Sequence, residues 1–208
     1  MNLAILGATG ATGRHVVEQA LAAGHSVTAV VRDPSRLPGR AGLRLVRADL
    51  DDPAGLATAV RGSDAVICAL GAPGRDRARV RERGTRSVAA AMRQEGVRRI
   101  VALSSYGVGD SRQRLPLWIR YGLVPLLLGP GFADHEAQEG FLRDSDLDWT
   151  ILRPPFLTDE PGGGAVARGD DLAHTRMKIP RADVARELLA AVGDRSTIGR
   201  AVGIASAR

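Results

Sequence analysis

The residues Asn2-Leu3-Ala4-Ile5-Leu6 run directly into Gly7-Ala8-Thr9-Gly10-Ala11-Thr12-Gly13, and the fold class can be inferred from this junction. The apolar run predicts a buried strand, and residues 11–23 after it have the spacing of an amphipathic helix. Gly7 permits the tight turn between them, Gly10 lets the backbone approach a pyrophosphate, and Gly13 allows close helix-to-strand packing. Free N–H groups at the helix start attract an anion, and Thr9 and Thr12 add hydroxyl donors. A GxxGxxG loop in this context therefore predicts dinucleotide binding.

Short apolar runs alternate with longer amphipathic ones along the rest of the chain, which is typical of βαβ units. Strands are predicted at residues 2–6, 26–31, 43–47, 65–70, 99–103 and 149–152, and helices at 11–23, 53–60, 77–94 and 135–144. We therefore expect an α/β fold with a doubly wound, mostly parallel Rossmann sheet flanked by helices.

The character of the sequence changes after Arg153, with two prolines and then Gly162-Gly163-Gly164. A further helix is predicted at 181–192 and a last strand near 201–205. This tail is too short for a core of its own, so we interpret residues 1–208 as a single domain whose part after about 154 is a substrate-side extension. The glycine triplet predicts a mobile loop near the edge of the sheet where ligands bind.

The 208 residues are 44% hydrophobic and 25% charged, close to globular averages. Cys68 is the only cysteine, which excludes an internal disulfide and a Cys-rich zinc site, and its apolar neighbours predict burial. The histidines outside the predicted site share no spacing, so no metal site is expected. The first residues have no basic leader, which favours a cytoplasmic location. The apolar segment 115–128 contains prolines and an arginine and is too short to span a membrane, so we expect it to cover a pocket or to form a homodimer contact.

The formal net charge is +6, yet Lys178 is the only lysine, which excludes a GxxxxGK phosphate loop. A nucleic-acid binder is a weak alternative, because aromatic residues make up only 3% of the chain and leave little for base stacking. Arginines crowd the run 75–83 at every second position. We interpret this run as a solvated helix start, with an anion-facing loop as the alternative.

The end of the second predicted strand decides between the two nicotinamide cofactors. An NAD site usually places a carboxylate there to hold the ribose diol, whereas this chain has Arg32, followed closely by Ser35 and Arg36. A guanidinium group stacks on adenine and pairs with a 2′-phosphate, so NADPH is predicted in preference to NADH. Asp33 is expected to point away from Arg32.

The GATGATG loop, VVRDPSRL at the second strand, ADLDD near Asp49 and DWTILRPPF near the sixth strand together resemble the atypical short-chain dehydrogenase/reductase group. The likeness is to its NAD(P)H-binding branch of flavin reductases of the biliverdin reductase B type and NmrA-like proteins. By that resemblance, Asp49 and Leu50 border adenine, and Ala69, Leu70 and Gly71 border the ribose. Ser104, Ser105, Pro154, Pro155 and Phe156 would lie beside the nicotinamide. Asp49 as a turn or cap residue and the prolines as strand terminators are the structural alternatives.

The YxxxK pair of tyrosine-dependent members of that superfamily is absent, since neither Tyr106 nor Tyr121 has a lysine four residues later. Tyr106 follows the fifth strand and is a candidate hydrogen-bond donor, with a loop tyrosine as the alternative. His135 is the other candidate, in an HxxxE pattern that ends at Glu139 and that the resemblance links to the biliverdin reductase B-like branch. It is predicted at a helix start, whose positive potential would lower its pKa. A surface or capping histidine is the alternative.

These observations favour an NADPH-dependent reductase that passes hydride to a small planar acceptor such as a flavin, a quinone or a conjugated carbonyl. Ser105 would orient the acceptor or the nicotinamide, with Tyr106 and His135 as donors. The alternative is an NmrA-like protein that senses NADP without turnover.

Overall fold

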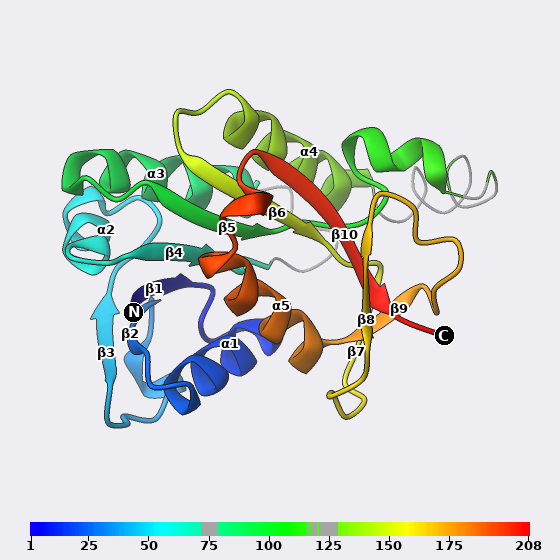
Figure 1. The fold of residues 1–208 in the computed structure, drawn as a ribbon. Helices are drawn as coiled ribbons and strands as arrows, with labels where there is room; N and C mark the ends of the chain where they lie inside the picture. The colour runs from blue at the N-terminus through cyan, green and yellow to red at the C-terminus, as the bar shows by residue number, and fades with distance from the viewer. Residues whose placement is uncertain (72–78, 116, 118–119, 121–128) are drawn as a thin grey trace.

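The computed structural model describes residues 1–71, 79–115, 117, 120 and 129–208. Its main sheet has eight strands in the order β3-β2-β1-β4-β5-β6-β10-β8, and β7 and β9 form a separate parallel pair. All neighbours in the main sheet are parallel except β10 and β8, which run antiparallel. The expected doubly wound sheet is confirmed, and Figure 1 shows it with helices on both faces.

The strands are β1 (Asn2–Leu6), β2 (Ser26–Val31), β3 (Leu43–Arg47), β4 (Ala65–Cys68), β5 (Arg99–Leu103), β6 (Asp148–Arg153), β7 (Phe156–Thr158), β8 (Val166–Gly169), β9 (Lys178–Pro180) and β10 (Arg200–Ser206). The helices are α1 (Ala11–Ala22), α2 (Pro53–Val60), α3 (Val80–Glu95), α4 (Gly129–Arg143) and α5 (Arg181–Gly193).

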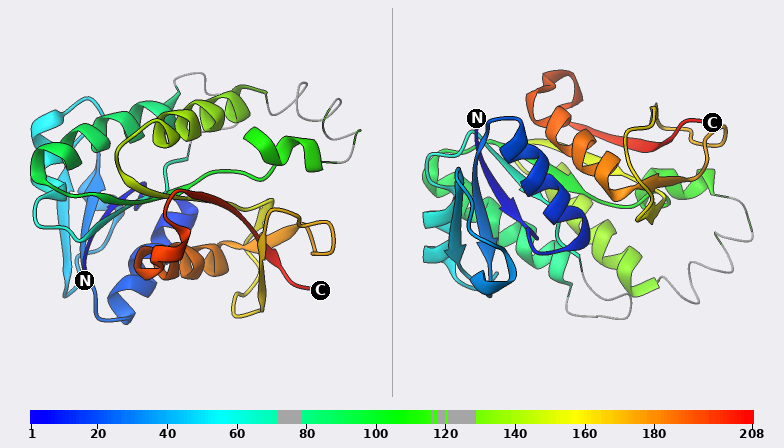
Figure 2. Two further views of the ribbon diagram at one scale, coloured as in Figure 1. Left: turned by 45° about the horizontal axis from the view of Figure 1, so that its top comes forward. Right: turned by 90° about the horizontal axis from the view of Figure 1, so that it is seen from below.

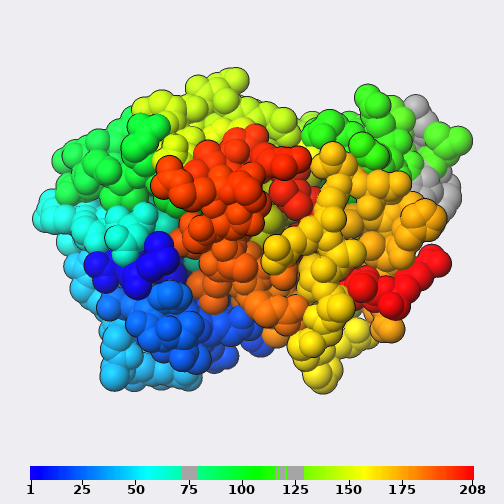
Figure 3. Space-filling model, viewed as in Figure 1, coloured from blue at the N-terminus to red at the C-terminus, as the bar shows by residue number. Residues whose placement is uncertain are grey.

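Two apolar layers hold these elements together because the central strands are buried on both faces. Leu3 and Ile5 of β1 point into the core shared with α1 and α5. Ala4 and Leu6 point the other way, into the core under α2, α3 and α4. Figure 2 shows the two helical layers from two further directions, and Figure 3 shows α1 and α5 side by side on one face.

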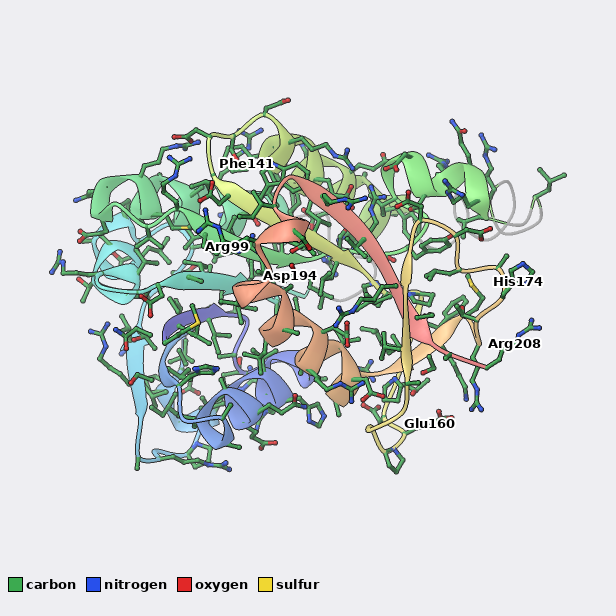
Figure 4. The ribbon with its side chains drawn as sticks, in the orientation of Figure 1. Arg99, Phe141, Glu160, His174, Asp194 and Arg208 are labelled. Atoms are coloured by element: carbon green, nitrogen blue, oxygen red, sulfur yellow. The ribbon has the colours of Figure 1, made fainter. Side chains whose placement is uncertain are left out.

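A half-buried guanidinium group ties the end of α5 to the sheet. Arg99 on β5 donates to the carbonyl oxygens of Ala191 and Val192, and to that of Asp148 at 2.7 Å. It therefore satisfies carbonyl groups at a helix end that lack partners within the helix. Figure 4 labels Arg99 and, close to it, Asp194 just after α5.

Two predicted helix boundaries are wrong. The predicted helix 135–144 begins at Gly129, because Pro130 lies in the first turn, where a proline costs no hydrogen bond. The predicted helix 77–94 begins at Val80, after Arg79 in a left-handed conformation with φ of 50°. β7, β8 and β9 were not predicted, because each has only three or four residues and no clear alternation.

Candidate active site

A cavity of about 790 Å³ lies at the carboxyl edge of the parallel strands, where ligands bind in open α/β sheets. Its walls come from the ends of β1, β2 and β5, from the residues that follow β1 to β5, from the starts of α1, α3 and α5, and from single residues of α4 and β7. The lining residues are Leu6, Gly7, Thr9, Gly10, Ala11, Thr12, Val30, Val31, Arg32, Arg36, Ala48, Asp49, Leu50, Ala69, Leu70, Gly71, Val80, Arg81, Arg83, Leu103, Ser104, His135, Leu157 and Arg181.

The glycine loop forms one wall, and its three glycines have different surroundings. Gly7 has φ of 79°, and a side chain there would collide with the carbonyl group of Ala69. A side chain on Gly13 would collide with the backbone of Gly7 and Ala8, so Gly13 serves packing and does not line the cavity. Gly10 faces the cavity, and an added Cβ would lie 3.1 Å from the Gly7 oxygen. The first turn of α1, whose N–H groups lack partners within the helix, therefore borders the cavity through Gly10, Ala11 and Thr12.

The end of β2 places two exposed arginines in the cavity wall. Arg32 and Arg36 both line it. Asp33 instead accepts hydrogen bonds from the N–H and the hydroxyl of Ser35, at 3.0 and 2.7 Å, and begins a short 3-10 helix. These bonds lower the pKa of Asp33. The hydroxyl of Ser35 is therefore used in a hydrogen bond to Asp33. Ser35, predicted as a cofactor-binding residue, is not among the residues that line the cavity.

The residues after β3 and β4 that the resemblance assigns to the adenosine half of a cofactor all line the cavity: Asp49, Leu50, Ala69, Leu70 and Gly71. The carboxylate of Asp49 accepts a hydrogen bond from the N–H of Leu50 at 2.6 Å. Gly84 on α3 packs against Leu50 and Leu70, with no room for a side chain. That the five lining residues after β3 and β4 bind a cofactor stays a prediction.

Ser104 directly follows β5 and lines the cavity, and its side chain is held by a buried hydrogen bond. Its hydroxyl donates to Oε1 of Glu139 at 2.6 Å. Glu139 is paired in turn with Arg153, through Nε at 2.9 Å and Nη2 at 2.5 Å, and all three side chains are buried. Asp110 completes the group by accepting from Arg153 at 2.8 Å, which lowers the pKa of Asp110. This network fixes the loop after β5 against α4 and β6.

Ser105 and Tyr106 do not line the cavity. The Ser105 hydroxyl lies 3.4 Å from the Tyr106 carbonyl oxygen. The Tyr106 hydroxyl donates to the carbonyl of Asp170 at 3.2 Å and accepts from the N–H of Leu172 at 3.4 Å, and burial raises the pKa of Tyr106. Tyr106 is only 5% exposed and packs with Leu172. In this structure its hydroxyl therefore anchors the C-terminal extension.

His135 lines the cavity, but it is the seventh residue of α4 and not at a helix start. Burial lowers the pKa of His135 to about 3, and the positive charge of Arg81 adds to this shift against smaller opposing effects of Asp134 and Gln138. The direction of this shift is the predicted one and favours a neutral imidazole, but its main cause is burial and not a helix-end potential. His135 is half-buried, with Nδ1 buried.

The extension meets the cavity through different residues from those expected. Pro154, Pro155 and Phe156 are not among the lining residues, and Phe156 is 55% exposed, whereas Leu157 lines the cavity. The predicted loop 162–164 is tied to α5: the N–H of Gly163 donates to Asp183 at 2.7 Å. Of the apolar segment 115–128, residues 116, 118, 119 and 121–128 lie outside the described residues.

Three arginines of the cavity wall were missed as site residues. Arg81 and Arg83 come from the start of α3 and Arg181 from the start of α5. Arg81 and Arg83 belong to the arginine run that we interpreted as a solvated helix start, and they line the cavity from that helix start, where Arg83 also pairs with Asp51 at 2.6 Å. Arg181 carries no local signal, because only the tertiary fold brings α5 to this edge.

A profile of the NAD(P)H-binding family matches residues 7–195, most of the chain and all of the glycine loop. The chain belongs to this family. One family relative in sequence, UPF0659 protein C216.03 of Schizosaccharomyces pombe, is 34% identical over 85% of this chain and 78% of its own length. The uncharacterized sugar epimerase YhfK of Bacillus subtilis is 29% identical over 97% of this chain and 92% of its own length.

Several solved structures have the same fold as the present chain. The oxidoreductase ylbE from Lactococcus lactis has a TM-score of 0.86 at 23% identity and covers 100% of this chain and 92% of its own. A short-chain dehydrogenase/reductase from Veillonella parvula, solved with NADP, has a TM-score of 0.83 at 18% identity and covers 99% and 94%. This chain therefore has the fold of these two proteins.

The described residues contain no group of three or more His, Cys, Asp or Glu side chains placed to hold a metal ion. None of their helices is long and apolar enough to cross a lipid bilayer.

Proposed function

We propose that this protein is an NADPH-dependent reductase that transfers hydride to a planar, electron-poor small molecule such as a flavin, a quinone or a conjugated carbonyl. One observation carries the proposal: a single cavity runs from the glycine loop past Arg32 to Ser104 and His135. Among the described residues that line it, five are arginines and one, Asp49, is a carboxylate. Such a surplus of positive charge suits a ligand with several phosphate groups.

The choice of NADPH rests on the end of β2. Arg32 and Arg36 both line the cavity there, and Arg14 fixes the loop by donating to the carbonyl oxygens of Thr9 and Arg36 at 3.2 and 2.9 Å. The neighbouring carboxylate of Asp33 is occupied by Ser35. A 2′-phosphate would therefore meet guanidinium groups, and a ribose diol would find no carboxylate partner at this position. The complex of the Veillonella protein with NADP adds support by analogy.

The proposed class of acceptor rests on the two candidate proton donors, neither of which is suited to act as an acid in the cavity. When bound, NADPH supplies the hydride. Of the two candidate donors, Tyr106 uses its hydroxyl in hydrogen bonds with the backbone of the extension. The lowered pKa of His135 leaves its ring neutral at physiological pH. An acceptor whose reduced form is stabilised by delocalisation can take its proton from water, so it needs no acid from the protein.

The described side chains would act by binding and orientation. Ser104 is held in place by Glu139, and Leu103 and Leu157 give the same region apolar surface. A rigid wall of this kind orients a flat ring system without chemical participation.

The direct test is binding followed by turnover. Calorimetry should show tighter binding of NADPH than of NADH, and NADPH oxidation should be followed by absorbance with FMN, menadione and a cyclic enone as acceptors. Oxidation with at least one of these acceptors is expected. Tight NADPH binding with no oxidation in any assay would instead favour the sensing function, and failure to bind either nucleotide would overturn the proposal.

A further inference from the structure

The hydroxyl group of Ser104, in the cavity wall, forms a short hydrogen bond inside the protein. Its Oγ lies 2.6 Å from Oε1 of Glu139, and the two residues are only 4% and 2% exposed. A contact this short between two oxygen atoms has a proton between them. The oxygen that carries this proton decides what Ser104 can offer to a ligand, because a hydroxyl group has one proton and two lone pairs.

Two arginines show that the proton belongs to Ser104. Arg153 donates from Nε to Oε1 of Glu139 at 2.9 Å and from Nη2 to Oε2 at 2.5 Å, and Arg143 lies 3.3 Å from Oε2. Arginine stays protonated in proteins, and its paired N–H groups fit the two oxygens of an ionised carboxylate. Asp110 balances the second positive charge by accepting from both arginines, at 2.8 and 3.3 Å. Glu139 is therefore an acceptor only, and Ser104 is the donor.

We propose that Glu139 is a positioning residue that turns the hydroxyl proton of Ser104 away from the cavity, so that Ser104 binds a ligand only as a hydrogen-bond acceptor, from an amide or imide N–H group. The lone pairs of Oγ are what the hydroxyl still has to offer once its proton is used. The buried ion pair of Glu139 with Arg153 holds this arrangement in place before any ligand binds.

This polarity narrows the class of ligand that fits at Ser104. A carbonyl oxygen there would face lone pairs and no proton, and the repulsion would grow if hydride transfer placed negative charge on that oxygen. Flat groups with an N–H fit instead. The proposed complex offers two of them, the carboxamide of the nicotinamide and the ring imide of a flavin. This ligand assignment rests on the proposed function, whereas the direction of the hydroxyl bond does not.

Neutron diffraction tests the direction of the bond, on crystals grown in heavy water without a ligand. The deuteron of Ser104 should lie between its Oγ and Oε1 of Glu139. A deuteron carried by Glu139, or a Ser104 deuteron that points into the cavity, would overturn the proposal.

Two matched pairs of ligands test the N–H group by calorimetry. NADP⁺ is compared with its acetylpyridine analogue, in which a methyl ketone replaces the carboxamide. Lumiflavin is compared with N3-methyllumiflavin, both titrated into protein saturated with NADP⁺. In one of the two pairs, which then identifies the group at Ser104, the ligand with the N–H should bind roughly threefold to tenfold more tightly, the size of one hydrogen bond.

The two proposals fail in different ways. Tight binding of NADP⁺ without a preference for the N–H ligand in either pair would overturn the inference and leave the proposed function standing. No binding of NADP⁺ would overturn the proposed function, and with it the ligand assignment, while the neutron density still decides the direction of the bond.

Variants of Ser104 test whether the preference comes from its hydroxyl. Ser104→Ala should abolish the preference, and Ser104→Thr, which keeps a hydroxyl, should retain it. Ser145→Ala is the matched control, because Ser145 follows α4, donates its hydroxyl to the carbonyl of Leu142 and does not line the cavity. A preference that persists in folded Ser104→Ala would overturn the proposal.

Glu139→Gln should reverse the bond. An amide oxygen at the place of Oε2 still accepts from Arg153 and Arg143 and leaves one opposed pair of donors, at Nε of Arg153, whereas the other orientation leaves two. The amide N–H₂ then faces Ser104 and donates to it, which frees the Ser104 proton for the cavity. The preference for the N–H ligand should disappear while both ligands of the pair still bind. An unchanged preference in the folded variant would overturn the positioning role, and if the variant does not fold, the wild-type measurements decide.

Discussion

At the scale of single residues, Arg32 is the sharpest test of cofactor choice. It is exposed, lines the cavity and follows β2 directly. Arg32→Ala should weaken NADPH binding about 10-fold to 100-fold, the range of one lost charge-assisted hydrogen bond, and should leave NADH binding almost unchanged. Calorimetry with both nucleotides measures this. Arg40→Ala is the matched control, since Arg40 pairs only loosely with Glu18 at 3.9 Å and does not line the cavity. Equal losses for NADPH and NADH would argue against a 2′-phosphate at Arg32.

Gly10 and Gly13 should separate binding from folding. Gly10→Ala places a methyl group 3.1 Å from the Gly7 oxygen and toward the cavity, so the protein should fold but bind both nucleotides at least about tenfold more weakly. Gly13→Ala forces a collision with the backbone and should lower the free energy of unfolding by roughly 1–3 kcal/mol. Gly140→Ala is the control, because its Cβ would meet nothing within 4 Å. Normal nucleotide affinity in Gly10→Ala would mean that the ligand does not approach this loop.

At the scale of elements, a carboxylate from α4 holds the start of α3. Asp134 is 2% exposed and accepts hydrogen bonds from the N–H groups of Arg81 and Glu82, at 3.1 and 3.0 Å, and from the Arg81 guanidinium at 3.2 Å. Asp134→Ala removes this cap and leaves the half-buried Arg81 without that partner, so it should lower the free energy of unfolding, measured in urea, by roughly 2–3 kcal/mol. Adding Arg81→Leu should recover part of the loss. A double variant less stable than both single variants would show that the two side chains do not act as a pair.

At the scale of the whole molecule, the alternation of apolar and amphipathic runs predicted the sheet, because such patterns are local. His135 on α4 was predicted from the HxxxE resemblance, whereas most of the predicted lining residues directly follow strand ends, as Arg32 and Ser104 do. Tyr106 was assigned to the cavity by the same rule, yet its hydroxyl bonds to Asp170 and Leu172, more than sixty residues away. Contacts that depend on such distant segments leave no periodic signal, and the same is true of Arg181 in the cavity wall.

The free energy of unfolding should fall with pH in part because of His135. The pKa of its ring is about 3 in the folded protein and about 6.5 when unfolded, so between these values the unfolded chain binds more protons. Stability from this group is therefore complete above pH 6.5 and is lost as pH falls toward 3, by roughly 2 kcal/mol between pH 7 and pH 5. Other groups titrate in the same range, so the measured quantity is the difference in unfolding free energy between wild type and His135→Asn, which cannot titrate. Between pH 7 and pH 5, the wild type should lose roughly 2 kcal/mol of unfolding free energy relative to His135→Asn. A constant difference across the range would show that the folded ring titrates like a free imidazole, and then it would be charged in part near neutrality and able to donate from either nitrogen.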